Sequence, residues 1–552
     1  MAAPTIRIIP LGGIGEVGKN MLVVECGDDI IVIDAGLKFP EEEMLGVDLV
    51  IPDTSYLLEN KHRVRGIIIT HGHEDHVGAL PYIVSDLDAP IYSTSLTRGL
   101  IAVKLREHRL VDEARLNLVE PGELLRLGAF TVEFMPVNHS IPDGVALVVD
   151  TPVGRLLHTG DFKFDSSPVG GQPTDLAKLA ELGSRGVLAL LSDCIRVERP
   201  GYTPSERVVG ETFDAIMREA TGRVIITTFA SNISRIQQAI DVAHRYGRKV
   251  AVVGRSLASN LSVAKDLGYL HPPADTVLRL DQVRRLPHDK TVFITTGSQG
   301  EPTSVLSRIA NDDHRQIRIT SGDTVVLAAT PVPGNEETVA RTIDNLLRLG
   351  AEVVYEAVMT VHVSGHASRE ELRKMIQLVQ PRFCMPLHGE YRHMVLYRKL
   401  AKETGVPAKN VMLASTGDVI EFTADSMAKV GTVPAGSVLV DGLKAGEIGE
   451  VVLRQRRQLA RDGVVIAVVA FDRVTGQLVA GPDIVSRGFV EDETADWLMS
   501  EAREELRQAI GGSSRASLEP SYLTQKIKET LGIFLYRQTR RRPMILPVVT
   551  EV

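Results

Sequence analysis

Three histidines and two acidic residues fall within six consecutive positions of the sequence. This run, HGHEDH at positions 71–76, directly follows RVRGIIIT, a β-branched segment typical of a buried strand. Neutral imidazole and carboxylate groups are ligands that divalent zinc binds. An extended loop would direct His71 and His73 to one side, whereas Asp75 and His76 lie where a helix would begin. The spacing therefore predicts one loop that serves two neighbouring metal ions, because an ordinary polar loop rarely holds so many imidazoles.

A glycine-rich segment raises a competing hypothesis. GIGEVG at positions 13–18 follows a predicted strand, and Asp34 lies about twenty residues further on, which is the outline of a dinucleotide-binding fingerprint. That fingerprint must open a helix, whereas here the chain continues through KN into MLVVEC, another strand pattern. We therefore predict a tight turn near a crowded site instead of a nicotinamide cofactor.

The composition bounds the class of protein. A chain of 552 residues suggests about three or four domains. The net charge of −8 argues against a protein that coats nucleic acid nonspecifically, although it can hide local patches. Three scattered cysteines do not indicate a disulfide framework, so a reducing cytoplasm is expected. The sequence contains neither a secretory signal nor an apolar run of about 20 residues, so no membrane association is expected.

The strands and helices that must position these residues follow two different patterns along the chain. Residues 5–195 alternate short β-rich runs with turns and occasional helical patterns, which predicts a layered α/β fold with two sheets. Residues 200–355 alternate strand and helix regularly, which is typical of a parallel sheet covered by helices on both faces. The first pattern resumes at 360–425, so the middle segment is predicted to be inserted into a split first domain. A smaller α/β module is expected from about 455 onward.

Several motifs, taken together, resemble one family. H-x-H-x-D-H after a buried strand resembles the metallo-β-lactamase signature, and Asp34 in VIDAG, His139 in PVNHSIPD and Asp161 in LHTGDFK follow in the expected order. VHVSGHAS (361–368) and PLHGEYRH (386–393) are similar to later motifs of the β-CASP nucleases. SDCIRVERPGYTPSE, TTFASNISRIQQ, TGSQGEP and VSRGF narrow the resemblance to the ribonuclease J group, over essentially the whole chain.

The resemblance implies an α/β fold: a metallo-β-lactamase αββα sandwich with an inserted β-CASP parallel-sheet domain and a small C-terminal α/β domain. The expected boundaries are 1–199 and 358–430 for the two parts of the metallo-β-lactamase domain, 200–357 for the β-CASP domain, 431–455 for a linker and 456–552 for the C-terminal domain.

The resemblance also implies two metal sites that share Asp161. The expected ligands are His71, His73, His139 and Asp161 for one ion, and Asp75, His76, Asp161 and His388 for the other. Asp34 would orient the ligand loop. Zinc suits these ligands, and manganese is chemically reasonable at the second site. Family members can also carry a structural calcium, for which Asp48 and Asp441 are candidates.

Two metal ions suit phosphodiester hydrolysis, which needs an activated water and neutralised phosphoryl oxygens. We expect Asp75, His366 and Asp193 to be catalytic, with His366 as the general acid or electrostatic stabiliser for the leaving 3′ oxygen and Asp193 fixing its tautomer. A purely structural His366 is the alternative.

Two strand-to-helix turns could bind an anion. TTFASN and SGHASREEL place small residues at helix N-termini, where backbone N–H groups are free for an anion. Gly365 permits close backbone approach, and Ser368 with Glu371 forms a capping box. Each turn alone is a well-capped helix; together they resemble the family's pocket for a 5′-monophosphate nucleotide. The expected pocket residues are Ser231, Asn232, Ile233, His362, Val363, Ser364, Gly365 and His366.

The resemblance implies a metal-dependent ribonuclease with 5′→3′ exonuclease activity on 5′-monophosphate RNA and endonuclease activity, in mRNA decay and ribosomal RNA maturation. It also implies single-stranded RNA as partner, homodimers or homotetramers, and an RNA-degradation complex. The alternatives are a β-CASP nuclease acting on DNA or RNA 3′ ends, a lactonase or thioester hydrolase of the same fold, and an RNA-binding scaffold with a decayed metal site. Cys194-Ile195-Arg196 stands where the family usually has Ser-Thr-Asn, and Ser234 where His or Tyr is more common.

Overall fold

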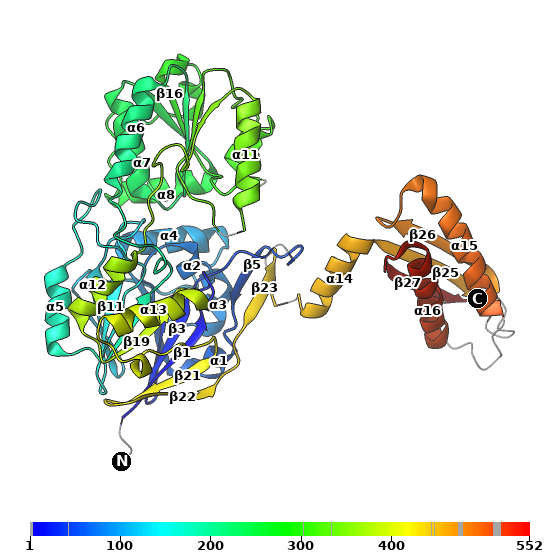
Figure 1. The fold of residues 1–552 in the computed structure, drawn as a ribbon, viewed down its shortest axis with the longest axis horizontal. Coiled ribbons are helices and arrows are strands. Elements are labelled where there is room, and N and C mark those ends of the chain that lie inside the picture. The colour runs from blue at the N-terminus through cyan, green and yellow to red at the C-terminus, as the bar shows by residue number, and fades with distance from the viewer. Residues whose placement is uncertain are drawn as a thin grey trace. The chain divides into compact units, whose positions relative to one another are not determined.

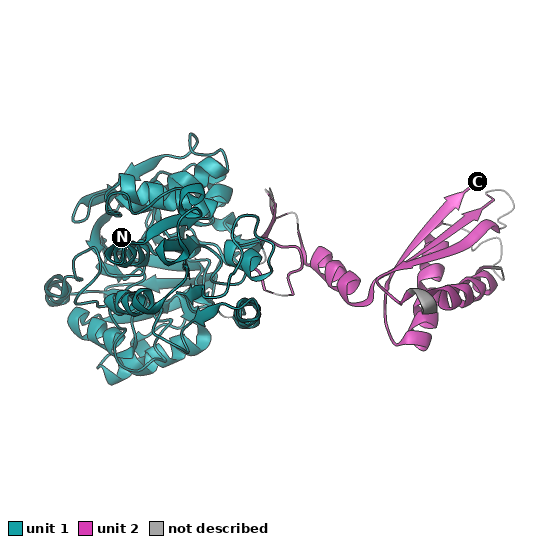
Figure 2. Ribbon diagram, turned by 90° about the horizontal axis from the view of Figure 1, so that it is seen from above, with its two compact units in different colours: residues 1–39, 49–438 teal, residues 40–48, 439–552 magenta. Residues whose placement is uncertain are grey.

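The structure, a computed structural model, describes residues 4–41, 43–301, 303–332, 334–442, 444–446, 448–472, 478–511 and 520–552. The chain forms two compact units, Met1–Phe39 with Leu49–Val438 and Pro40–Asp48 with Leu439–Val552 (Figure 2). Across these described parts, none of the helices combines the length and apolar character that crossing a membrane requires.

Two large β-sheets form the base of the first unit (Figure 1). The first has eight strands in the order β22 (Met427–Thr432), β21 (Asp418–Phe422), β1 (Ile6–Gly12), β3 (Met21–Cys26), β4 (Asp29–Ile33), β6 (Val64–Ile68), β7 (Ile91–Ser93) and β8 (Leu116–Leu118). The second has six in the order β19 (Phe383–Leu387), β13 (Ala189–Asp193), β12 (Arg155–His158), β11 (Val145–Asp150), β10 (Phe130–Pro136) and β9 (Leu124–Leu127).

The two sheets pack face to face because their strands alternate apolar side chains on both faces. Ile8 of β1 belongs to the buried cluster that also contains Phe134 of β10, between the sheets. The neighbouring Ile9 belongs to a second cluster, under α3 (Leu80–Leu87) and α4 (Ser95–Glu107). The second sheet is covered by α5 (Leu176–Arg185), α12 (Arg369–Val379) and α13 (Tyr391–Glu403), whose apolar side chains join the first cluster. The layers are those of an αββα sandwich, as predicted.

The middle of the chain forms a separate sheet between β13 and β19. These two strands are parallel neighbours, with Asp193 opposite Leu387, so the chain leaves the second sheet and returns beside its exit point. The sheet in between is entirely parallel, in the order β15 (Lys249–Val253), β16 (Thr291–Thr295), β14 (Val224–Thr227), β17 (Thr324–Leu327) and β18 (Glu352–Val354).

Helices cover both faces of this parallel sheet. One face packs against α6 (Arg207–Glu219), α7 (Ile233–Arg245) and α8 (Arg255–Asp266), and the other against α10 (Val305–Ala310) and α11 (Glu336–Arg348). Figure 1 shows α6, α7 and α11 around this sheet. The prediction of an inserted parallel sheet with helices on both faces is therefore confirmed. Shorter elements of the first unit include β5 (Leu49–Pro52), α1 (Ser55–Glu59) and α9 (Leu280–Val283).

The second unit is a small α/β module. Its sheet has the order β26 (Leu478–Arg487), β25 (Val464–Phe471) and β27 (Met544–Glu551), and its buried cluster includes side chains of α15 (Asp492–Gly511) and α16 (Pro520–Thr539). Residues 431–455, expected as a linker, include β23 (Ser437–Asp441), β24 (Lys444–Ala445) and the start of α14 (Glu450–Asp462). This segment is more ordered than its sequence GTVPAG indicated, because the β-branched run that follows forms a strand.

Candidate active site

The predicted metal ligands gather at the carboxyl ends of parallel strands from both large sheets. β4 and β6 are parallel, and their ends lead to Asp34 and to the 71–76 loop. β12, β13 and β19 are parallel as well, and their ends lead to Asp161, Asp193 and His388. The carboxyl ends of parallel strands meet at the same edge of a sheet, which is where open α/β proteins bind ligands. The topology thus brings together side chains that are far apart in the sequence.

The first group of ligands is rich in nitrogen. His71 Nε2 lies 3.0 Å from His73 Nδ1, which in turn lies 3.1 Å from His139 Nε2. Asp161 Oδ2 lies 3.7 Å from His71 Nε2 and 3.8 Å from His139 Nε2. The three imidazoles form one of the sets able to hold a metal ion in the described structure.

Hydrogen bonds on the far side of these rings determine which nitrogens carry lone pairs. His139 Nδ1 donates to the Gly365 carbonyl at 2.8 Å. His71 Nδ1 lies 3.1 Å from the Thr70 hydroxyl, which itself donates to Asp34. These bonds assign the tautomers and leave the two Nε2 atoms as acceptors. Burial also lowers the pKa of His73 to about 4, and the pKa values of His71 and His139 well below the usual 6.5. Neutral imidazoles with converging lone pairs fit a divalent cation.

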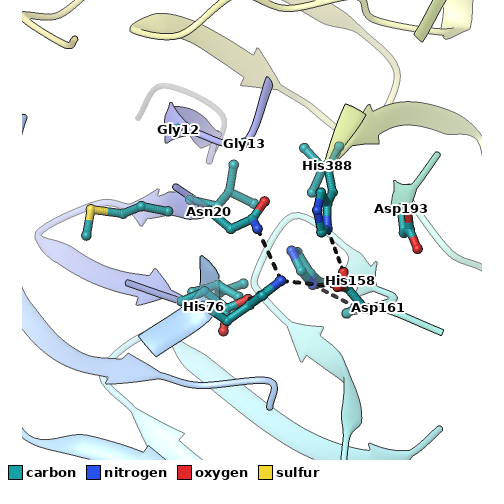
Figure 3. Close-up of a pocket in the computed structure, with 14 residues that line it drawn as sticks. Gly12, Gly13, Asn20, His76, His158, Asp161, Asp193 and His388 are labelled. Carbon is teal, nitrogen blue, oxygen red and sulfur yellow. Dashed lines mark hydrogen bonds and ion pairs between the residues drawn. The ribbon is translucent and has the colours of Figure 1, made fainter. Parts of the chain in front are cut away.

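The second group, here called carboxylate-rich, contains two aspartates and two histidines. Figure 3 shows three of its members, His76, Asp161 and His388. His76 Nε2 lies 3.2 Å from Asp161 Oδ2 and 3.5 Å from Asp75 Oδ2. His388 Nδ1 lies 2.8 Å from Asp161 Oδ1, and its Nε2 lies 3.4 Å from Asp75 Oδ2. Burial alone would lower both histidine pKa values, yet Asp161 and Asp75, with Asp34 at His76, raise that of His76 well above its usual value and that of His388 to about 9. A positive charge is therefore favoured here, which a bound divalent cation also satisfies.

Asp34 connects the strand ends to this second group. Its backbone adopts a left-handed conformation, with φ of 63°, and its side chain is buried. One carboxylate oxygen accepts from the Thr70 amide at 2.8 Å, and the other lies 2.8 Å from His76 Nδ1. The short helix α2 (Glu74–Val77) begins where the sequence predicted and carries His76 toward Asp34. The Nε2 atom of His76 consequently faces the predicted metal position.

Asn20 and the glycine-rich segment also shape the centre. Asn20 Nδ2 donates to the Asp75 backbone carbonyl at 3.0 Å and to its carboxylate at 3.3 Å, and Figure 3 shows the amide directed toward His76. The backbone amide of His388 donates to the Gly13 carbonyl at 2.7 Å, beside the pairing of β2 (Ile14–Gly15) with β20 (Gly389–Glu390). The segment then enters β3, so a strand stands where a dinucleotide-binding fingerprint would open a helix.

Sequence reasoning missed Asn20 and also His158. His158 lies in the lining of the same cavity as Asp34, His76 and Asp161 (Figure 3), and burial lowers its pKa to about 4. Its position three residues before Asp161, in LHTGD, was the available signal. Asn20 had no comparable signal, because its contacts depend on the fold of a distant loop.

His366 and Asp193 form a pair next to the carboxylate-rich group. His366 Nδ1 lies 2.8 Å from Asp193 Oδ2 and 3.9 Å from Asp161 Oδ2. Asp193 is buried and His366 is partly exposed. The pairing directs the Nδ1 hydrogen toward Asp193, so His366 Nε2 is left for an external partner.

The 361–368 loop lies against the nitrogen-rich group. An added side chain at Gly365 would place its Cβ 2.5 Å from His139 Nδ1, so close approach requires glycine there. Ser364 Oγ accepts from the His366 amide at 3.2 Å, and His362 Nδ1 lies 2.8 Å from the Thr330 hydroxyl. The buried Val363 accepts at its carbonyl from Arg235, at 3.3 Å.

The helix N-termini near this loop are less available than predicted. The predicted capping box at α12 is present, and Glu371 Oε2 accepts from the Ser368 amide at 2.8 Å and from the Thr203 amide at 2.7 Å. At α7, Asn232 Oδ1 accepts from the Arg235 amide, and the Ile233 amide donates to the Ser231 carbonyl. The expectation of free amides at both helix N-termini is therefore wrong for these amides. The amides of Ser368, Arg235 and Ile233 already donate to acceptors within the protein. Anion binding would rely on the loop itself.

The remaining predicted positions have individual environments. Cys194 is buried, and burial raises its thiol pKa well above the usual value, so it is an unreactive core residue. Ser234 Oγ donates to the Val169 carbonyl at 3.2 Å. Asp48 Oδ2 accepts from the Gly442 amide at 2.7 Å, and Asp441 pairs with Arg456 at 2.9 Å. Neither carboxylate joins a metal-competent group in the described ranges, and calcium binding stays a prediction.

Four family descriptions match successive parts of the chain. They are the metallo-β-lactamase superfamily at residues 14–190, the ribonuclease J β-CASP domain at 221–346, the Zn-dependent metallo-hydrolase RNA specificity domain at 350–412 and the ribonuclease J C-terminal domain at 451–552. Their order agrees with the sandwich, the inserted sheet and the C-terminal module.

Curated relatives match over nearly the full length. "Ribonuclease J2" of Bacillus subtilis is 44% identical, covering 99% of this chain and 99% of its own. "Ribonuclease J 1" of Streptococcus pyogenes is 41% identical, covering 99% and 97%. The chain belongs to the ribonuclease J family. It is thus a hydrolytic, metal-dependent ribonuclease that binds divalent metal and RNA, and the resemblance drawn from the motifs is confirmed.

Solved structures that match this chain include one with a similar fold. A protein of unknown function from Enterococcus faecalis matches with a TM-score of 0.53 at 17% identity, covering 76% of this chain and 100% of its own. At that identity the likeness shows the fold alone. Together with the family matches, it agrees with the predicted fold class.

Proposed function

We propose that this ribonuclease J family member removes nucleotides from the 5′ end of single-stranded RNA, prefers a 5′-monophosphate end, and also cuts RNA internally. The observation that carries the proposal is the contact between the predicted metal ligands and the 361–368 loop, which contains the predicted nucleotide-binding residues. His139, in the nitrogen-rich group, donates to the carbonyl of Gly365, in the 361–368 loop. A terminal nucleotide held by that loop would lie at a defined short distance from the hydrolytic centre, which favours removal of one nucleotide at a time.

The metal ligands divide between two cations in this proposal. The first would be held by His71, His73, His139 and Asp161, and the second by Asp75, His76, His388 and Asp161. Two divalent cations supply an activated water and neutralise charge on the scissile phosphate. Zinc suits the nitrogen-rich group, whereas the carboxylate-rich group also suits manganese. Asp34 would orient His76 through the hydrogen bond at 2.8 Å.

His366 would act on the leaving group. Because Asp193 accepts the Nδ1 hydrogen, the Nε2 atom of His366 can present a proton to the departing 3′ oxygen. Asp193 would stabilise the positive ring before the transfer and would keep its orientation afterward. Proton donation at this point completes the cleavage of the P–O bond.

The terminal phosphate would be bound by Ser364, His362 and the neighbouring backbone, with Ser231, Asn232, Ile233 and Val363 shaping the pocket. Burial and the positive charge of Arg235 lower the pKa of His362 to about 3, so its ring is neutral at physiological pH. A local excess of positive charge favours the phosphate dianion. An internal cut would require the RNA strand to pass through this pocket without a bound end.

A time course on end-labelled RNA tests the proposal. Substrates labelled at the 5′ or 3′ end, with monophosphate, triphosphate or hydroxyl 5′ ends, separate direction from end preference. We expect immediate release of labelled mononucleotide only from the 5′-monophosphate, 5′-labelled RNA. Early release from the 3′-labelled substrate would contradict the direction.

The pocket assignment has its own test. Ser364→Ala should reduce exonuclease activity more than cleavage of a circular RNA, which has no 5′ end. Ser184→Ala, at an exposed position of α5, is the matched control and should behave as wild type. Equal losses on linear and circular RNA would argue against the pocket.

We also propose that the enzyme acts in the cytoplasm, in mRNA decay and ribosomal RNA maturation. It would work as a homodimer or homotetramer and within an RNA-degradation complex. The family resemblance supports these proposals. Mapping RNA 5′ ends after depletion of the protein tests the cellular role, and sedimentation analysis of the purified chain tests the assembly.

A further inference from the structure

Arg196 carries a buried side-chain nitrogen that has no hydrogen-bond partner among the described residues. It lies three residues after Asp193, within the Cys-Ile-Arg sequence that departs from the usual family pattern. Its side chain is partly buried, and its Nε atom is fully buried without a hydrogen bond in the described structure. Buried donors are nearly always paired, so an unpaired guanidinium nitrogen needs an explanation. Nearby Arg235 shows the contrast, because its Nε and NH2 bond both oxygens of Glu206, at 2.7 and 2.9 Å.

The loop that carries Arg196 is fixed to the start of α12. The Ile195 amide donates to Asp193 Oδ1 at 3.0 Å. The Arg369 amide donates to the Arg199 carbonyl at 2.9 Å, and Arg369 Nε donates to the Val197 carbonyl at 3.0 Å. Because α12 directly follows the 361–368 loop, these bonds hold the Arg196 loop beside the proposed nucleotide pocket. The backbone from which the Arg196 side chain extends is therefore held in place by these bonds.

The two glutamates whose charges act on Arg196, Glu371 and Glu356, already accept hydrogen bonds from other groups. Glu371 already accepts three backbone amides, those of Phe164, Thr203 and Ser368. Glu356 accepts from the Thr330 hydroxyl at 2.7 Å. The positive charge of Arg196 also reaches His362, since it contributes, after burial and Arg235, to the low pKa of that ring.

We propose that Arg196 binds the 5′-terminal phosphate of the RNA and thereby strengthens the preference for a monophosphate end in this chain. This inference rests on the proposed function. A guanidinium can donate two parallel hydrogen bonds to one phosphate, and such charge-assisted bonds are about twice as strong as neutral ones. A terminal monophosphate offers more negative charge than an internal phosphodiester, so the selectivity would act at the chain end.

Steady-state kinetics of Arg196→Gln test the inference on the full chain. With 5′-monophosphate RNA, we expect KM to rise about 10- to 100-fold, the range for loss of a hydrogen bond to a charged group, with little change in kcat. With 5′-hydroxyl RNA and circular RNA, KM should stay within about twofold of wild type. Arg196→Lys should be intermediate, because an ammonium group lacks the planar pair of donors. Arg199→Gln, at an exposed position of the same loop, is the matched control.

Two measurements besides activity distinguish binding from a structural role. Isothermal titration with uridine 5′-monophosphate should show weaker binding to Arg196→Gln than to wild type and Arg199→Gln. Thermal unfolding should show an unchanged or higher Tm for Arg196→Gln, because the substitution removes a buried donor that lacks a partner. A Tm lowered by several degrees would assign Arg196 to the fold.

The substrates separate the ways in which the inference can fail. If Arg196→Gln kept the wild-type preference for 5′-monophosphate RNA, Arg196 would not bind the 5′-terminal phosphate. If it lost activity equally on linear and circular RNA, the contact would be to an internal phosphate, which also overturns the inference. If the wild-type enzyme itself made no distinction between 5′-monophosphate and 5′-hydroxyl ends, the proposed function would fail first.

Discussion

Asp34→Asn should weaken binding of the second cation while leaving the fold intact. The carboxylate of Asp34 accepts from the Thr70 amide and hydroxyl and from His76 Nδ1. An asparagine that keeps the Thr70 bonds would turn its NH2 group toward His76. The ring would then carry its hydrogen on Nε2, the atom that faces Asp161 and Asp75. The backbone should tolerate the change, because asparagine adopts a left-handed conformation such as φ of 63° readily.

The size of this effect follows from the loss of one supporting hydrogen bond. Substitutions of groups that orient metal-binding histidines typically reduce metal affinity about 10- to 100-fold. That range corresponds to about 1.4–2.7 kcal/mol of binding free energy. We expect the loss at the carboxylate-rich group, because His71, His73 and His139 keep the hydrogen bonds and neighbours that form the other group.

The assay is a titration of zinc in chelator-buffered solutions, with bound metal measured by elemental analysis and RNA cleavage measured in parallel. In Asp34→Asn, half-occupancy of one of two sites and half-maximal activity should shift together to higher free zinc. Asp323→Asn is the control, since Asp323 is also buried and accepts from Thr320 and Arg223, but within the inserted domain. That variant should lose stability and keep wild-type metal affinity. An unchanged zinc curve for Asp34→Asn would refute the reasoning.

Three further predictions concern the same unit. His76→Ala should abolish exonuclease and endonuclease activity with the circular dichroism spectrum unchanged; full turnover of 5′-monophosphate RNA would contradict its role as a ligand. Gly365→Ala should lower activity on all RNA substrates and reduce metal content, because the new methyl group would lie 2.5 Å from His139 Nδ1; wild-type metal content would argue against that coupling. Tyr56 donates to Glu25 at 2.6 Å, and burial with this carboxylate raises its pKa to about 12. Since the pKa is higher in the folded state, urea titrations should show the stability advantage over Tyr56→Phe intact below pH 10 and shrinking toward pH 12.

Local patterns were enough to predict much of the fold. MLVVEC was expected as a strand and forms β3 over Met21–Cys26, because its β-branched residues are buried on both faces of a sheet. The helix start after His73 was expected and is present as α2. The strand–helix rhythm of the middle segment likewise predicted a parallel sheet. In each case, short-range spacing determines the element.

The sequence was less informative wherever a distant partner decides the outcome. Glu371 was expected only to cap α12, yet its carboxylate also accepts hydrogen bonds from the amides of Thr203 and Phe164. The carboxylate therefore lies at the helix N-terminus where an anion was predicted to bind. Asn20 contacts Asp75 only because the glycine-rich turn packs against the 71–76 loop. The unpaired state of Arg196 is visible only once its neighbours are in place. Hydrogen bonds between residues that are far apart in the sequence produce no local spacing pattern, so the sequence alone does not predict them.

The 71–76 loop shows why residue type alone does not assign chemistry. His73 and His76 are three residues apart and both lie beside carboxylates, His73 partly buried and His76 buried. Desolvation nevertheless dominates the first and lowers its pKa, whereas Asp161, Asp75 and Asp34 dominate the second and raise its pKa. The difference arises because α2 turns His76 toward the strand ends that carry Asp34 and Asp161, while His73 in the extended part faces the ring of His139. One short run therefore builds a nitrogen-rich and a carboxylate-rich group, and the partners from distant strands decide which histidine joins which group.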